Sequence, residues 1–267
     1  MLKKILVLLL LLILSPLSCS WNTYQNQPVR EVIPRNSFLF VKKVLTVYRC
    51  VENVCERSNL RASASAYVVR VVPAGVFAMT AAHVCEDEPI AGVDPETMSA
   101  AYTLIRIDGE EFSAKVLEYD RTIDACMLFV EGAKGLEAIP IADRPPSPGD
   151  RVFNVAAPRA LFRPGVAPIM EGRYSGQTDS AAWYTLPAAP GSSGSMIVNA
   201  EGELVGMVHS VFMHFPIITL STRYDDLRAF INNNLNKYSI GRHTATLGGI
   251  TLRDLEDLLG LGLTKPD

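Results

Sequence analysis

Residues 75–83 read Gly-Val-Phe-Ala-Met-Thr-Ala-Ala-His, a short apolar run that ends in small residues and a histidine. Similar short runs, rich in β-branched and aromatic side chains, recur along the whole chain between turn residues. They lie at 38–41, 66–69, 102–107, 113–118 and 126–130, and then at 151–156, 167–173, 182–186, 196–198, 204–210 and 216–221. Many short strands separated by frequent turns are typical of antiparallel β-barrels, so the sequence predicts an all-β fold.

A proline-rich segment divides the strand pattern into two halves. Residues 145–149 read Pro-Pro-Ser-Pro-Gly, which cannot build a β-ladder. We therefore expect a first β unit over 38–144, preceded by an N-terminal arm over 21–37, and a second β unit over 145–240. The second ends in a helix near 222–234, whose apolar residues share one face. The tail over 241–267 has a helix-start pattern at Thr251. A small docked helix and a disordered end are the two alternatives for this tail.

The composition is that of an ordinary globular protein, with 48% hydrophobic and 20% charged residues among 267. The formal net charge is -3 and no long basic run occurs. A nucleic-acid partner is therefore not expected.

The first 20 residues have the pattern of a secretory signal. Lys3 and Lys4 precede an apolar run over 5–14, which is too short to span a bilayer, and small residues follow Pro16. Leu17-Ser18-Cys19 resembles the end of a bacterial lipobox, although Pro16 stands where leucine is usual. Plain secretion and membrane anchoring through a lipidated Cys19 both stay open, and a retained membrane anchor is the third alternative. The expected location is secreted, periplasmic or in the cell envelope.

Two of the cysteines flank a predicted hairpin loop. Residues 44–48 are β-prone, and residues 51–54 suit a loop between antiparallel strands. Cys50 and Cys55 would then face each other within disulfide reach.

Three short words carry the candidate chemistry, and they occur in the order base, carboxylate, nucleophile. His83 ends the run quoted above, Asp124 lies in Thr-Ile-Asp-Ala, and Ser193 lies in Gly-Ser-Ser-Gly-Ser. A serine hydroxyl needs a base within hydrogen-bond reach, and a histidine with an ordinary pKa near 6.5 suits that task. Gly191 and Gly194 permit a tight turn, in which the Gly191 and Ser193 amides can bind an oxyanion.

The remaining two cysteines lie close to these words. Cys85 follows His83 by two residues, and Cys126 follows Asp124 by two. If base and carboxylate touch, a Cys85–Cys126 disulfide would join their two segments. Two buried free thiols are the alternative.

The three words resemble those of trypsin/chymotrypsin-like serine proteases, most closely the short bacterial branch with the glutamyl endopeptidases and HtrA-type proteases. The resemblance implies two six-stranded antiparallel barrels, a C-terminal helix, a cleft between the barrels, and catalysis through His83, Asp124 and Ser193. It also implies that the strand after the nucleophile loop contacts the substrate, which points to Val208, His209 and Ser210. Pro187 stands where trypsins place an acid, so no pocket for lysine or arginine is implied.

His209 raises the possibility of a preference for acidic residues, but it lies one position later than the histidine of the glutamyl endopeptidases. A small or apolar preference is the alternative. The sequence shows no metal-ligand spacing and no cofactor fingerprint. The expected function is therefore a serine endopeptidase acting on a polypeptide substrate, with no metal and no cofactor. A silent binding module on the same fold and an esterase with the same triad are the alternatives.

Overall fold

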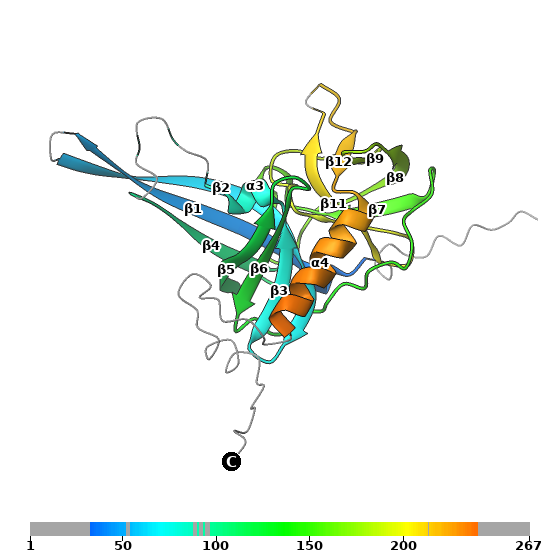
Figure 1. Cartoon of the computed structure of the whole chain (residues 1–267), viewed down its shortest axis with the longest axis horizontal. Coiled ribbons are helices and arrows are strands. Elements are labelled where there is room, and N and C mark those ends of the chain that lie inside the picture. The colour runs from blue at the N-terminus through cyan, green and yellow to red at the C-terminus, as the bar shows by residue number, and fades with distance from the viewer. Residues whose placement is uncertain are drawn as a thin grey trace, which may run out of the picture.

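The structure, a computed structural model, describes residues 33–51, 54–87, 90, 93, 97–212 and 214–239, without the side chains at 50, 51 and 54. Its strands close into two separate six-stranded antiparallel barrels, as the resemblance implies (Figure 1). The first barrel contains β1 (Phe38–Val51), β2 (Val54–Val72), β3 (Gly75–Thr80), β4 (Met98–Arg106), β5 (Glu111–Asp120) and β6 (Ala125–Glu131). The second contains β7 (Arg151–Val155), β8 (Ile169–Gln177), β9 (Ala182–Tyr184), β10 (Met196–Val198), β11 (Leu204–Val211) and β12 (Thr219–Ser221).

Four short or terminal helical elements occur in the described part of the chain. They are η1 (Arg35–Ser37), α3 (Ala82–Cys85), η3 (Pro158–Ala160) and α4 (Tyr224–Ser239). The strand orders are β1-β2-β3-β6-β5-β4 and β10-β11-β12-β9-β8-β7, so β4 closes on β1 and β7 closes on β10.

The largest apolar cluster lies between the barrels and joins them. Strand β3 contributes Val76 and Ala78 to the interior of the first barrel, and Phe77 and Met79 to the shared cluster. Because both faces of β3 are covered, all six of its residues are buried. This explains why residues 75–79 are continuously apolar rather than alternating.

Helix α4 leaves the second barrel and returns to the first (Figure 1). The Tyr238 hydroxyl donates to the carbonyl of Leu117 at 3.1 Å, and its ring stacks on Phe77 with 6.1 Å between centroids. The helix was expected over 222–234; it starts at Tyr224 and continues to Ser239 because its last turn packs on the first barrel.

Several strands differ in their bounds from the sequence expectation. The runs at 38–41 and 66–69 are only parts of β1 and β2, which together form a hairpin arm that projects from the first barrel (Figure 1). The run at 167–173 is shifted and corresponds to β8. The run at 216–221 forms a strand only over Thr219–Ser221. Pro216 has no N–H to donate to a ladder, and Ile217 is half exposed.

The two cysteines nearest to His83 and Asp124 are bonded to each other. Cys85 and Cys126 form a disulfide with 6.5 Å between their Cα atoms. Strand pairing brings them together, because Thr80 at the end of β3 lies opposite Cys126 on β6. Cys50 and Cys55 face each other in the β1–β2 register, and Cys55 is disulfide-bonded, whereas the side chain of Cys50 lies outside the described residues.

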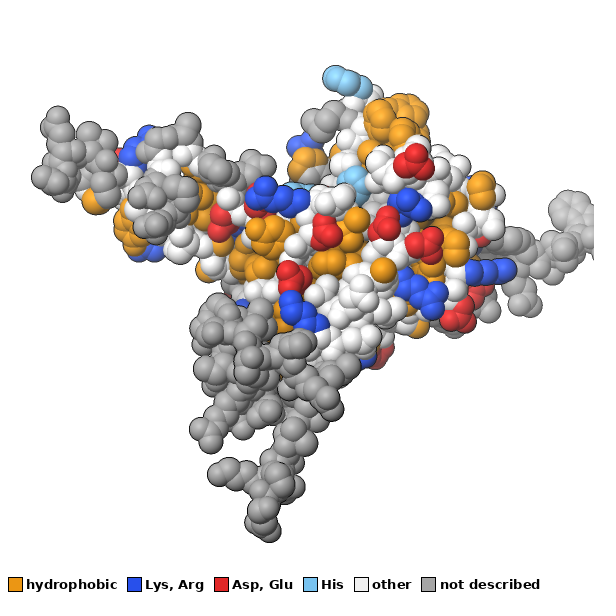
Figure 2. All heavy atoms as spheres, in the orientation of Figure 1, with side chains coloured by type: hydrophobic (Ala, Val, Ile, Leu, Met, Phe, Trp, Pro, Cys, Tyr) orange, Lys and Arg blue, Asp and Glu red, His pale blue; other side chains and the backbone are white. Residues whose placement is uncertain are grey.

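Charges of both signs alternate over the face shown in Figure 2. Within the described residues, no helix is both long enough and apolar enough to cross a membrane. The predicted signal over 1–20 with Cys19, most of the arm over 21–37, and the tail over 241–267 lie outside the described residues.

Candidate active site

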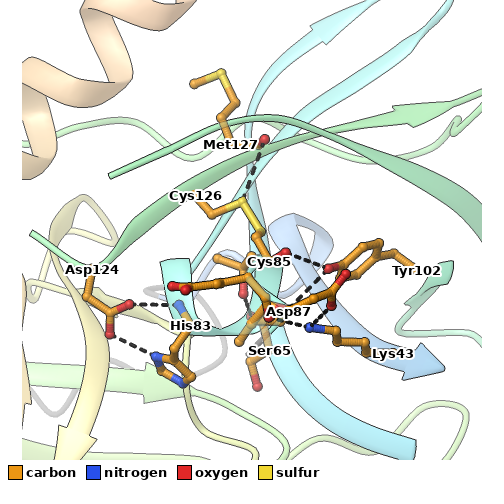
Figure 3. The surroundings of a disulfide bond; sticks show 12 residues. Lys43, Ser65, His83, Cys85, Asp87, Tyr102, Asp124, Cys126 and Met127 are labelled. Carbon is orange, nitrogen blue, oxygen red and sulfur yellow. Dashed lines mark hydrogen bonds and ion pairs between the residues drawn. A yellow bond between two sulfur atoms is a disulfide. The ribbon is translucent and has the colours of Figure 1, made fainter. Parts of the chain in front are cut away.

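His83 and Asp124 form a two-point contact at one end of the first barrel. The short helix α3 starts directly after β3, so the backbone N–H of His83 points at the turn before β6. That N–H donates to Asp124 Oδ1 at 3.0 Å, and the His83 ring Nδ1 lies 2.8 Å from Asp124 Oδ2 (Figure 3). Both carboxylate oxygens are therefore used to orient a single histidine. The neighbouring Asp120 instead accepts from the Thr122 N–H in its own turn.

The surroundings of Asp124 favour its ionised form. Burial alone would raise its pKa, but hydrogen bonds from the His83 ring and backbone N–H outweigh burial and hold the pKa below its ordinary value. An ionised carboxylate only accepts hydrogen bonds, so the proton lies on His83 Nδ1. The other ring nitrogen, Nε2, is then the one that can accept a proton.

Asp124 also occupies an unusual backbone conformation. Its φ is 51°, in the left-handed region that non-glycine residues seldom adopt, although aspartate adopts it more readily than most. From the second barrel, Thr222 donates its hydroxyl to the carbonyl of Ile123 at 2.8 Å. The turn that presents the carboxylate is thus held from both barrels.

Ser193 lies in a turn that only glycines allow. Gly191 and Gly194 have φ values of 99° and 79°. A Cβ atom on Gly191 would lie 2.5 Å from the carbonyl oxygen of Ala157, and one on Gly194 would lie 2.2 Å from the hydroxyl oxygen of Thr80. The loop therefore sits against the segment that ends in His83 as well as against the second barrel.

Two backbone amides of this loop are unbonded. Neither the Gly191 N–H nor the Ser193 N–H donates a hydrogen bond within the described part of the chain. The carbonyl of Pro190 accepts from the Arg159 N–H at 2.6 Å. Because the peptide bond between Pro190 and Gly191 is trans, the Gly191 N–H lies on the side opposite to that carbonyl. The Gly191 N–H therefore points away from Arg159 and is available for an oxyanion.

Ser65 on β2 holds this loop, a contact that the sequence pattern does not predict. The Ser65 hydroxyl donates to the carbonyl of Gly191 at 2.9 Å and accepts from the Ala157 N–H at 3.0 Å. The Ser65 N–H donates to the carbonyl of Ser193 at 2.9 Å. This side chain is fully buried, so its bonds are not shared with bulk water. The only sequence signal is the run of small residues Ala-Ser-Ala-Ser-Ala at 62–66.

His83, Gly191 and Ser193 all line one cavity of about 440 Å³ between the barrels. The Ser193 hydroxyl makes no hydrogen bond within the described residues. Contacts between nucleophile and base are often long in the absence of substrate and tighten when it binds. The structure thus brings the candidate base, the candidate nucleophile and the two unbonded amides to one cavity.

The residues expected to contact substrate lie outside that cavity. Val208 is buried, and both its backbone groups are used: its N–H donates to Ser195 at 3.0 Å and its carbonyl accepts from Gly194 at 2.7 Å. Pro187 and Ser210 are exposed.

His209 lies in a bulge of β11, and its ring Nδ1 is 2.9 Å from the Ser210 hydroxyl. Burial lowers the His209 pKa, an effect that the charge of Asp124 opposes. The charges of both Asp124 and His83 act on His209, so its ring lies near the histidine–aspartate pair.

No group of three or more histidine, cysteine or acidic side chains is arranged to hold a metal ion among the residues that the structure describes.

The fold and the site together define the class of protein. Two antiparallel six-stranded barrels with a histidine–aspartate pair on one, and a glycine-framed serine loop on the other, are the arrangement of a chymotrypsin-like peptidase. A family model described as trypsin-like peptidase domain matches residues 64–207, more than half of the chain. The chain therefore belongs to the trypsin-like peptidase domain family. No curated protein matches it.

Proposed function

We propose that this protein is a serine endopeptidase that uses Ser193 as nucleophile, His83 as general base and Asp124 as the carboxylate that orients His83. The observation that carries the proposal is the contact of both Asp124 oxygens with His83, which leaves His83 Nε2 free beside the cavity that Ser193 lines. Membership in the peptidase family supports the same reaction class.

The geometry suggests a sequence of proton transfers. As Ser193 Oγ attacks the scissile carbonyl carbon, its proton passes to His83 Nε2, and the carbonyl oxygen becomes an oxyanion. The Gly191 and Ser193 N–H groups bind that oxyanion. His83 then gives the proton to the leaving amine, which departs and leaves an acyl-enzyme. Water, deprotonated by His83, hydrolyses the ester and regenerates the Ser193 hydroxyl.

The test is labelling by a fluorophosphonate together with cleavage of an unbiased peptide library. We expect both from the native chain and neither from Ser193→Ala. The matched control is Ser180→Ala, which removes a hydroxyl from an exposed turn and should keep both. Labelling with ester turnover but without peptide cleavage would replace the endopeptidase by an esterase. A folded native chain that is neither labelled nor active would indicate the silent binding module.

We also propose that the protein acts outside the cytoplasm. The Cys85–Cys126 disulfide and the bonded state of Cys55 support an oxidising compartment, where disulfides persist. The signal pattern over 1–20 supports export, and Cys19 supports attachment to the envelope. Fractionation of cells that produce the native chain or Cys19→Ser tests both points. Export of both forms, with only the native chain in the membrane fraction, is expected for a lipidated Cys19, whereas retention of the native chain in the cytoplasm would refute export.

A further inference from the structure

A free strand edge starts at the nucleophile loop and continues along the hairpin arm. Ser65 donates its N–H to Ser193, so at this residue the N–H of β2 points away from β1 and toward the site. Residues two apart in a strand direct their N–H and C=O groups to the same side. Ser63, Arg61, Asn59 and Arg57 therefore direct theirs to this same edge, since the β1–β2 register has no bulge there.

This edge of β2 has no strand partner within the described residues before Tyr67, where pairing with β3 starts. On its other side, β2 pairs with β1 over its whole outer part, and β1 pairs in turn with β4. The arm is thus a three-stranded sheet with β2 at its border, and the border leads directly to Ser193. From Ser63 to Arg57, at about 3.3 Å per residue, it offers about 20 Å of unpaired backbone.

The two faces of the sheet differ beside this edge. One face borders the cavity that Ser193 lines, where Leu45, Leu60 and Ile90 supply apolar surface. The one lysine of that cavity, Lys43, is paired with Asp87 at 2.9 Å. Arg61, on the strand edge, borders this cavity as well as the one described next. The sheet face itself presents Leu45, Leu60, Ala62 and Ala64 here and therefore suits apolar side chains.

The opposite face is cationic. It borders a second cavity of about 610 Å³ lined by Lys42, Arg61, Arg163 and Glu111, among others. Glu111 is occupied by Lys42 at 2.9 Å. Arg57 lies further out on the same face as Arg61, because both belong to the same alternating set. Among the described residues, neither arginine has a carboxylate partner.

We propose that the β2 edge binds the part of the polypeptide substrate that follows the scissile bond, as an added antiparallel strand whose side chains alternate between apolar and acidic. This rests on the proposed function: β2 runs from Arg57 toward Ser65 beside Ser193, so an antiparallel strand on its edge runs outward from the site in its N-to-C direction and is the part that follows the scissile bond. Main-chain bonds to the edge hold the strand, and its alternate side chains meet the two faces. Arg57 and Arg61 select acidic residues several positions beyond the cleaved bond.

The first experiment measures binding without cleavage. The full chain carrying Ser193→Ala is titrated into a labelled eight-residue peptide of alternating leucine and aspartate, and into its leucine–lysine counterpart. The aspartate peptide should bind about 2- to 30-fold more tightly, as expected for two exposed ion pairs, and added salt should reduce the difference. Arg57→Glu with Arg61→Glu should reverse the preference. The control Arg49→Glu, on β1 opposite Glu56 and on the other face, should not.

The second experiment tests the strand geometry. Only alternate N–H groups of an added strand face β2, so N-methylation of one alternate set should abolish binding and methylation of the other set should preserve it. Equal affinity for the two charged peptides, or equal effects of both methylation patterns, would overturn the proposal. Fluorophosphonate labelling of native Ser193 is measured in parallel. Labelled native protein without any peptide preference refutes only this inference, whereas peptide preference without labelling refutes only the proposed catalysis.

Discussion

Replacing both Cys85 and Cys126 by alanine should cost this protein about 4 kcal/mol of stability. The disulfide closes a loop with a sequence separation of 41 residues, and the loop-entropy relation gives about 4 kcal/mol for a loop of that length. Both cysteines are buried, so the lost sulfur contacts add to the effect rather than oppose it. For a domain of this size, 4 kcal/mol corresponds to a decrease in Tm of about 8–16 °C.

The assay is thermal unfolding of the native chain and the double variant, each with and without a thiol reductant. The reductant should lower the Tm of the native chain further than that of the double variant, because only the native chain retains this bond. Neither cysteine takes part in the hydrogen bonds between His83 and Asp124. The folded double variant should therefore still cleave peptides well below its Tm. A decrease in Tm below about 2 °C would refute the argument that this bond constrains the unfolded chain.

Three further outcomes follow from the site. Gly191→Ala should reduce kcat by about 10²–10³, because the new Cβ meets the Ala157 carbonyl oxygen at 2.5 Å and displaces an oxyanion donor. The control Gly149→Ala has a similar φ but nothing within 4 Å of the new Cβ, so it should leave kcat unchanged. Ser65→Ala leaves two buried backbone groups unpaired and should cost about 2–6 kcal/mol in urea unfolding, with kcat reduced more than KM increases; unchanged stability would contradict its role. Asp124→Asn should lower kcat by about 10⁴. The pKa of Asp124 is lower in the folded than in the unfolded chain, so its charge stabilises the fold above the unfolded pKa near 4. This stabilisation is lost as pH falls through the folded pKa. The free energies of unfolding of the native chain and Asp124→Asn should therefore converge in acid.

Much of the fold was predictable because local patterns agree with it. The continuous apolar runs at 75–79 and 126–130 correspond to β3 and β6, which are covered on both faces. Residues 145–149 interrupt the ladder pattern between the two barrels, and the hairpin that flanks the Cys50–Cys55 segment has the expected register.

What the sequence left open depends on contacts between distant segments. The choice between a disulfide and free thiols at Cys85 was decided by the pairing of β3 with β6. The role of Ser65 was not visible because its hydroxyl acts on Gly191, 126 residues later. No local pattern encodes which carbonyl a buried serine meets. The length of the arm was missed for a related reason: β1 is supported by both β2 and β4, and the second of these partners lies far along the chain.

The bridge from Ser65 to the serine loop has a consequence for the timing of activity during biosynthesis. His83 and Asp124 both belong to the first barrel, but the proposed nucleophile and both proposed oxyanion donors come from residues 191–193 and are fixed by a serine that was synthesised much earlier. A chain that has formed only its first barrel therefore contains the proposed base but not the proposed nucleophile. Under the proposed mechanism, hydrolysis therefore requires docked barrels, and we expect a chain that has folded only its first barrel to be inactive.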